Sequence, residues 1–566
     1  MSHQEKQGKK PRVTGAPSDE NSIFSFGSLG GDAAGSGEVD LRIAKEKDNW
    51  LDRFLEKAGD SCSSIVVKET RQSIKSRQFV WTFFATILIT LIVTLFNLSD
   101  WSTASRLGQT LLMAYLVIMG LPLMIIVPLS VFQSLASEQN DGTLQLISIT
   151  TMKPLQIVLG KLGSAALQIV IYMSVLAPCV TFTYLLRGVD IYQILASLSC
   201  GFGISLSLCC LGLVLASVST TRMSAGVFQL FFVAILLVSA WMWSMLSWGL
   251  TAGFGFIDSE IGFFIAAWAC AILSFAALFL VAATAQITFV SDNRSTYLRI
   301  AMLVQQTLFV AFCIGLMSVP WSNSPDTFHF MLLVTLHYWL FMGSIMTATS
   351  PQLSNRARRS MPRTLLGSRL GGLLMPGPGR AYLFSWANGI FCCGLMVVYS
   401  FLFNTQDDTF GFVFLSVIYF SLYLSASYIF NRIVSGRSKE PFLAAGVLGL
   451  GLVMFMPSVV GTLLQSIDYQ HSFFGRGFLA CLNWYTANAM LDRGGGASGG
   501  LGWVAGILMV VIASLLTTGY AMLSSSREFI VSAIATPRHV LDEDRDFEKR
   551  DALGNKEEII DDIFAD

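Results

Sequence analysis

The sequence predicts an all-α polytopic membrane protein with about twelve transmembrane helices. Hydrophobic residues make up 53% of the 566-residue chain and charged residues 13%, against roughly 25% charged residues in a typical soluble domain. The apolar residues gather in runs that reach the length of about 20 residues that a helix needs to cross a bilayer. Lys and Arg are abundant in every second connection between these runs and scarce in the others, as in multi-pass membrane proteins.

Twelve apolar runs are long enough to span as helices. They lie at residues 79–97, 109–133, 164–186, 193–217, 225–248, 261–290, 300–320, 328–349, 382–403, 410–431, 441–464 and 501–523. Nineteen Lys and Arg residues lie on alternate connections, and four lie on the opposite ones. Because these side chains resist translocation, the asymmetry predicts a multi-pass membrane protein with both termini in the cytoplasm.

The two ends of the chain are polar. Residues 1–64 form an expected cytoplasmic tail, which begins with a Gly- and Ser-rich stretch at 1–38 that we expect to be disordered. Residues 39–57 repeat apolar residues at helical spacing among basic ones. This pattern predicts an amphipathic helix, either on the membrane surface or packed on the protein's own cytosolic face. Residues 527–566 form an acidic cytoplasmic tail.

Several classes of function are disfavoured. The equal numbers of basic and acidic residues, 37 each, argue against nucleic-acid binding. Gly160-Lys161 lacks the preceding glycine and the following hydroxyl residue of a phosphate-binding loop, so we expect no ATPase activity and no catalytic residue in this chain. The cysteines and the five histidines lack metal-binding or disulfide spacing. We therefore expect no metal, no cofactor and no enzyme activity.

The predicted spans hold no Asp, Glu, Lys or Arg well within them. Carriers driven by ion gradients usually keep an ionisable residue deep in the membrane, so this pattern disfavours a secondary transporter. Trp241, Trp243 and Trp248 cluster near the end of the fifth run, which predicts an aromatic belt at the membrane surface.

The connection between the second and third runs has an unusual order of residues. Glu138 is followed by Gly142-Thr143-Leu144, a short apolar run to Ile149, then Lys153-Pro154 and Gly160-Lys161. The short run cannot span the bilayer, but it suits a helix along the inner membrane surface. We expect Gly142 to permit a sharp turn before that helix, the nearby acids to favour its N-terminus, and a new helix to begin at Pro154.

This order resembles the signature of ABC-2 type transporter permeases, the membrane subunits of ABC transporters. The preceding basic segment with Lys68, Glu69 and Arg71 is similar to the elbow that such permeases place before their first span. The resemblance covers residues 65–299, expected to be a module of six spans. It implies an ATP-driven exporter of the cell inner membrane, whose energy comes from a separate cytosolic ATP-binding subunit. The implied coupling residues are Glu138, Gly142, Thr143, Leu144, Lys153, Pro154, Gly160 and Lys161. Gln139, Asn140 and Asp141 depart from the family pattern, which commonly has a basic residue there.

Residues 300–526 hold six further runs but no second copy of this segment; an arginine-rich stretch at 356–380 takes its place. Either this half is a diverged second permease and one chain makes a complete pore, or it is an appended module and a second permease chain is needed. Two other functions stay open. They are a secondary transporter of another fold and a membrane scaffold that does not transport.

Overall fold

The fold was analysed in a computed structural model. It describes residues 64–99, 107–143, 153–186, 188–219, 222–251, 259–289, 292–317, 325–349, 372–403, 406–437 and 495–530, with a few single positions elsewhere. The predicted tail at 1–38, the amphipathic helix at 39–57, the run at 441–464 and most of the stretches 356–380 and 527–566 lie outside these residues.

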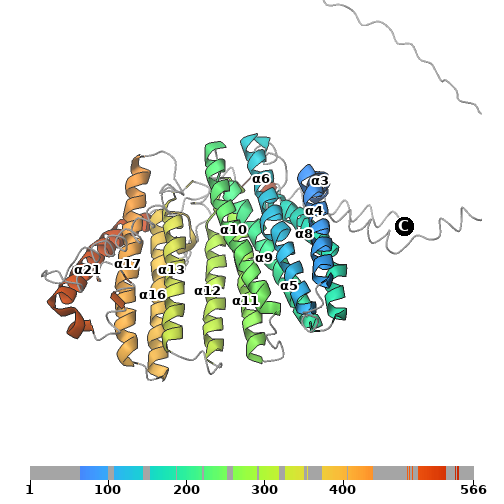
Figure 1. Ribbon diagram of the computed structural model, residues 1–566. Coiled ribbons are helices and arrows are strands. Elements are labelled where there is room, and N and C mark those ends of the chain that lie inside the picture. Colours follow the sequence, from blue (N-terminus) through green and yellow to red (C-terminus); the bar gives the residue numbers. More distant parts are fainter. Residues whose placement is uncertain are drawn as a thin grey trace, which may run out of the picture. The chain divides into compact units, whose positions relative to one another are not determined.

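The described residues form helices and their connections, without strands, which confirms the all-α prediction. The helices of the first half are α3 Ser64–Ile74, α4 Arg77–Ser99, α5 Leu107–Gly120, the π-helix η2 Leu121–Ile126, α6 Val127–Asn140, α8 Pro154–Leu185, α9 Ile191–Val218, α10 Arg222–Thr251 and α11 Ser259–Ile287. Those of the second half are α12 Thr296–Leu316, α13 Pro325–Thr347, α16 Pro378–Phe403, α17 Gln406–Arg437, α21 Gly495–Ser526 and the 3₁₀ helix η3 Arg527–Ile530 (Figure 1).

Eleven helices of the described chain are long and apolar enough to cross a membrane. Each coincides with one of the predicted runs, and α5, η2 and α6 together form one continuous helix for the second run. These helices make the chain a multi-pass membrane protein. The twelfth predicted span, 441–464, lies outside the described residues.

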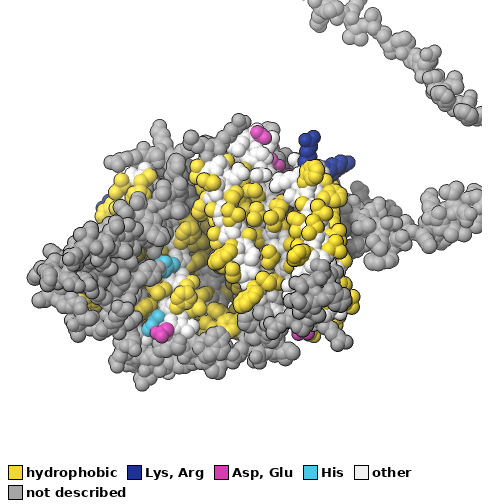
Figure 2. All heavy atoms as spheres, viewed as in Figure 1, with side chains coloured by type: hydrophobic (Ala, Val, Ile, Leu, Met, Phe, Trp, Pro, Cys, Tyr) yellow, Lys and Arg dark blue, Asp and Glu magenta, His cyan; other side chains and the backbone are white. Residues whose placement is uncertain are grey.

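The surface of the helices is apolar where a soluble protein would be polar. On α4, Trp81 is 75% exposed and Phe96 is 76% exposed, and α10 exposes Leu230 in the same way. Figure 2 shows such hydrophobic side chains covering the helices over much of the visible face, with Lys and Arg near the end at which α3 lies in Figure 1. An exposed apolar surface of this extent suits contact with lipid tails.

The buried apolar side chains form two clusters. One is built from α4 to α11 and the other mainly from α11 to α21. Each half was predicted to hold six spans, and we compare the spans that have the same number in the two halves. Five packed helix pairs of the first cluster then have counterparts in the second. The pairs α6–α8, α8–α9, α6–α9, α9–α11 and α8–α11 correspond to α13–α16, α16–α17, α13–α17, α17–α21 and α16–α21. The two halves therefore share much of their helix-packing pattern.

Charged residues lie only near the ends of the described spans. Seven Asp, Glu, Lys or Arg residues occur within these helices, and Lys161, the eighth residue of α8, is the deepest. The helices begin earlier than predicted, however. Lys161, Arg299 and Arg380 were expected in connections, but they lie within α8, α12 and α16 and are at most 3% exposed. Each donates hydrogen bonds to buried polar groups, which offset part of the cost of its desolvation.

Candidate functional site

A buried charged network joins α3, α6 and α8. The Lys161 Nζ lies 3.2 Å from the Glu69 Oε1 and 3.0 Å from the Glu138 Oε2. It also donates a hydrogen bond of 2.8 Å to the Ser134 Oγ, which in turn donates to the Glu69 Oε2 at 3.2 Å. The Lys161 and Glu69 side chains are 3% and 8% exposed. Two carboxylates surround one ammonium group, so the network carries one net negative charge.

Helical spacing explains how α3 supplies this network. Glu69, Gln72 and Ser73 lie three or four residues apart and line a common cavity, whereas Lys68 and Arg71 are exposed. The expected elbow is therefore an amphipathic helix that packs on α8 and ends at a turn before α4. Its carboxylate Glu69 faces the protein, and its basic residues face outwards.

The segment Glu138–Lys161 is described at its two ends, Glu138–Thr143 and Lys153–Lys161. Glu138 lies in the last turn of α6, which continues to Asn140, and the short helix expected after Gly142 falls outside the described residues. Gly142 has a φ of +71°, which confirms the sharp turn, and the Thr143 Oγ1 donates back to the Glu138 carbonyl at 3.1 Å. Leu144 and the rest of 144–152 lie outside the described residues.

The start of α8 agrees with the prediction. Lys153 precedes the helix in an extended conformation, and Pro154 is its first residue, where the missing backbone N–H costs nothing. The Lys153 N–H donates to the Gln156 Oε1 at 2.9 Å. Gly160 and Lys161, expected in the connection, lie two turns into α8 and are buried, and the Lys161 ammonium belongs to the charged network.

A break in the second span lies on the same helix as Glu138. Within η2 the Val127 N–H donates to the Pro122 carbonyl, five residues back. The next bond in this register would join Pro128 to the Leu123 carbonyl, but proline has no N–H. The Ser205 Oγ of α9 donates to that carbonyl instead, at 2.6 Å and fully buried.

A second brace comes from α10. The Trp243 Nε1 donates to the Leu116 carbonyl at 2.7 Å, and Trp243 is 1% exposed. The expected aromatic belt is therefore wrong for Trp243, whereas Trp241 and Trp248 are exposed. Pro122 and Pro128 in one apolar run were the available sequence signal for this break.

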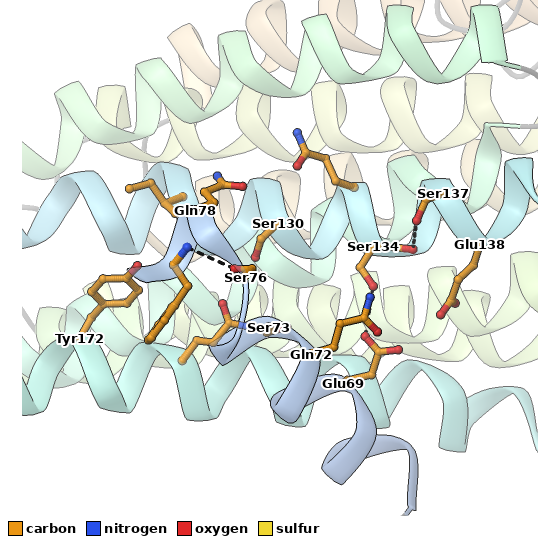
Figure 3. Close-up of a pocket in the computed structure, with 14 residues that line it drawn as sticks. Glu69, Gln72, Ser73, Ser76, Gln78, Ser130, Ser134, Ser137, Glu138 and Tyr172 are labelled. Atoms are coloured by element: carbon orange, nitrogen blue, oxygen red, sulfur yellow. Dashed lines mark hydrogen bonds between the residues drawn. The ribbon is translucent and has the colours of Figure 1, made fainter. Parts of the chain in front are cut away.

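A polar cavity of about 370 Å³ lies beside the charged network, between α3, α6 and α8. Figure 3 shows Glu69, Ser73 and Ser76 from one side and Ser130, Ser134 and Glu138 from α6 arranged around it. Its wall also includes Gln168 of α8, which is 4% exposed. Sequence reasoning assigned no role to Ser134 or Gln168, since a single serine or glutamine in an apolar run has no distinctive pattern.

The corresponding end of the second half has different chemistry. The Glu528 Oε2 accepts hydrogen bonds from the backbone N–H groups of Gly379 at 2.9 Å and Arg380 at 3.3 Å, at the start of α16. The Arg380 Nη2 donates to the Glu528 carbonyl at 3.0 Å, and Arg299 donates to the carbonyls of Leu373 and Met375. Burial raises the pKa of the Glu528 carboxyl above its ordinary value. This junction holds the end of α21 against α16.

Among the described residues no group of three or more His, Cys, Asp or Glu side chains could hold a metal ion. His337 donates through its Nδ1 to the Leu333 carbonyl at 2.7 Å and stacks on Trp484, as a structural histidine does. The chain matches no family model, no curated protein and no solved structure.

Proposed function

We propose that this chain is the membrane-spanning permease of an ATP-driven ABC transporter, acting as an exporter with a separate cytosolic ATP-binding subunit. The proposal starts from the resemblance of the segment Glu138–Lys161 to the ABC-2 signature. The observation that carries it furthest is the ion-paired network, in which Lys161 joins α3, α6 and α8 at the two ends of that segment.

Mechanically, the network makes the ends of the segment move together. A force on residues 143–153 would reach Glu138 on α6 and Lys161 on α8. It would also reach the elbow helix α3, because Glu69 of that helix pairs with Lys161. A buried ion pair resists separation because each charge would be left buried without its partner. The three helices would therefore shift as one body when nucleotide turnover in the partner changes its shape.

The break at η2 gives this movement a place to bend. The half of the second span that carries Glu138 is joined to α5 through a segment whose backbone bonding is irregular. π-Helical turns of this kind are frequent at functional sites. Under the proposal, α6 pivots at η2 together with α3 and α8, while α5 stays packed against α10.

Co-purification tests the proposal. The chain should be purified with an ATPase that contains a phosphate-binding loop, and Gly142→Pro should release that ATPase, because proline cannot adopt a positive φ. The control is Gly188→Pro, because Gly188 also has a positive φ, +86°, but lies in the α8–α9 connection. Gly226→Pro is not used, since it would break α10. Cargo movement driven by an ion gradient without any ATPase would contradict the proposal and favour the secondary transporter.

A further inference from the structure

We infer that the cavity between α3, α6 and α8 binds the headgroup of a phospholipid that carries a primary ammonium group. The inference does not depend on the proposed ATP-binding partner, because it rests on the cavity and its lining alone. The cavity volume of about 370 Å³ is within the range of small-ligand sites, roughly 300 to 1,000 Å³.

The charge of the wall favours a cation. Glu69 and Glu138 share the single ammonium of Lys161, so one negative charge has no counter-charge within the network. Glu138 is the more exposed of the two carboxylates, with 18% of its side chain accessible, and it lines the cavity. A ligand ammonium beside Glu138 would complete the neutralisation of the site.

Gln168 is a second and independent observation. The residue is 4% exposed and lines the cavity, yet its side chain makes no hydrogen bond with the described part of the chain. The amide is therefore open to the cavity, and polar groups in such a position are normally paired with water or a ligand. Its carbonyl, together with the hydroxyl of Ser130, offers acceptors for the three N–H donors of a primary ammonium group.

The position of the cavity favours a lipid over a free amine. Its wall includes residues on both sides of the turn between α3 and α4, such as Ser76 and Phe79, and α4 is a candidate membrane span that begins at Arg77. This places the cavity at the level of the lipid headgroups. Lys75 and Arg77 are exposed next to this turn, where they suit the headgroup phosphate.

The test compares three lipids with the same acyl chains. The full-length protein is reconstituted in vesicles of phosphatidylethanolamine, phosphatidylcholine and phosphatidylglycerol in equal parts, extracted in detergent, and its retained lipid is measured by native mass spectrometry. Phosphatidylcholine carries three N-methyl groups in place of the three N–H donors. We expect phosphatidylethanolamine to be retained at least about tenfold over phosphatidylcholine, the effect of losing one charged hydrogen bond.

Two variants assign the preference to this cavity. Gln168→Leu removes the buried amide at similar volume, and Glu138→Gln removes the uncompensated charge; each should abolish most of the preference. Gln229→Leu on α10, outside the cavity, should leave it unchanged. If Gln168→Leu unfolds the protein, Glu138→Gln decides, because its side chain is partly exposed.

Three outcomes overturn the inference. Equal retention of phosphatidylethanolamine and phosphatidylcholine would show that the N–H donors are not recognised. A preference for phosphatidylglycerol would assign lipid binding to the basic face of α3. A preference for phosphatidylethanolamine that survives both cavity variants would place the lipid elsewhere.

Discussion

At the scale of single residues, the account depends on Lys161. It is 3% exposed and lies within 3.2 Å of two carboxylates from two different helices. A charge in such a position is tolerated only because its partners are present, and the partners in turn depend on it. The network therefore responds strongly to the loss of one member and weakly to changes at exposed charges near it.

Lys161→Met should lower the free energy of unfolding by about 3 to 5 kcal/mol, because it leaves Glu69 buried without a counter-charge. Lys75→Met, at an exposed position of the same charge, should change it by less than about 0.5 kcal/mol. Denaturant unfolding in mixed micelles, followed by tryptophan fluorescence, measures both. Similar values for the two variants would mean that the buried network contributes no more than a surface charge.

Gly142→Ala should destabilise the protein by about 1 to 2 kcal/mol, since the φ of +71° is costly for a residue with a Cβ. Space is not the reason, because no heavy atom lies within 4 Å of a Cβ built there. Gly226→Ala provides the control. It has the same empty surroundings but lies within the helix α10, so it should be neutral or slightly stabilising. A harmless Gly142→Ala would contradict the strained turn.

At the scale of elements, the break at η2 is held by side chains from other helices. The Leu123 carbonyl accepts a hydrogen bond from the Ser205 hydroxyl in place of a backbone N–H. In the preceding turn, the Leu116 carbonyl accepts one from the Trp243 indole. The space for that indole is supplied by Gly120, where an added Cβ would lie 2.6 Å from the Trp243 Cδ1. The break is thus held by residues of three spans, and it predicts a specific coupling between two substitutions.

Ser205→Ala should cost about 1 to 3 kcal/mol in the free energy of unfolding, because it leaves the Leu123 carbonyl buried without a donor. Pro128→Ala restores a backbone N–H that can donate to that carbonyl in the π register. In the Pro128→Ala background, Ser205→Ala should therefore cost at least about 1 kcal/mol less. A double-mutant cycle measures the difference. Strictly additive effects would rule out this explanation of the break.

The Glu528 junction predicts a pH dependence. Burial raises the pKa of this carboxyl above its ordinary value of 4.5 in spite of the hydrogen bonds from Gly379 and Arg380. Ionisation is then harder in the folded than in the unfolded state, so the contribution of Glu528 to stability is fully present below the ordinary pKa. It is lost as the pH rises through the raised value.

Thermal unfolding of the wild type should therefore lose stability from about pH 4.5 upwards relative to Glu528→Gln, which does not titrate. The difference between the two unfolding temperatures, measured over this range, isolates the contribution of this one carboxyl. Parallel curves for the two proteins would contradict the raised pKa.

At the scale of the whole molecule, the positive-inside pattern predicts the side on which each connection lies. Cysteine in place of the exposed Thr143 or Ser526 should react with a membrane-impermeant maleimide only in inverted vesicles. A cysteine in place of the exposed Tyr192, at the start of α9 and on the predicted outer side, should react in intact cells. The unsubstituted chain corrects for its native cysteines. Labelling of Thr143 and Tyr192 from the same side would contradict the predicted topology.

The sequence predicted the helices well and their interactions poorly. Apolar runs and Lys and Arg counts are local properties, so eleven of the twelve runs coincide with described helices. The ends of the helices were missed, because Lys161, Arg299 and Arg380 are polar enough to look like connections until their buried partners are known. The Lys161–Glu69 pair spans 92 residues, and the Ser205–Leu123 bond spans 82. Contacts over such separations leave no periodic signal in a single sequence.

Photo-cross-linking from position 143 tests the central claim most directly, because Thr143 is exposed at the start of the segment that should receive the force. A photoreactive residue there, activated in intact cells, should link this chain to a protein that contains a phosphate-binding loop. The same residue at Tyr192 should give no such product. If position 143 yields no ATP-binding protein, or if position 192 yields the same product, the segment does not couple this chain to an ATPase.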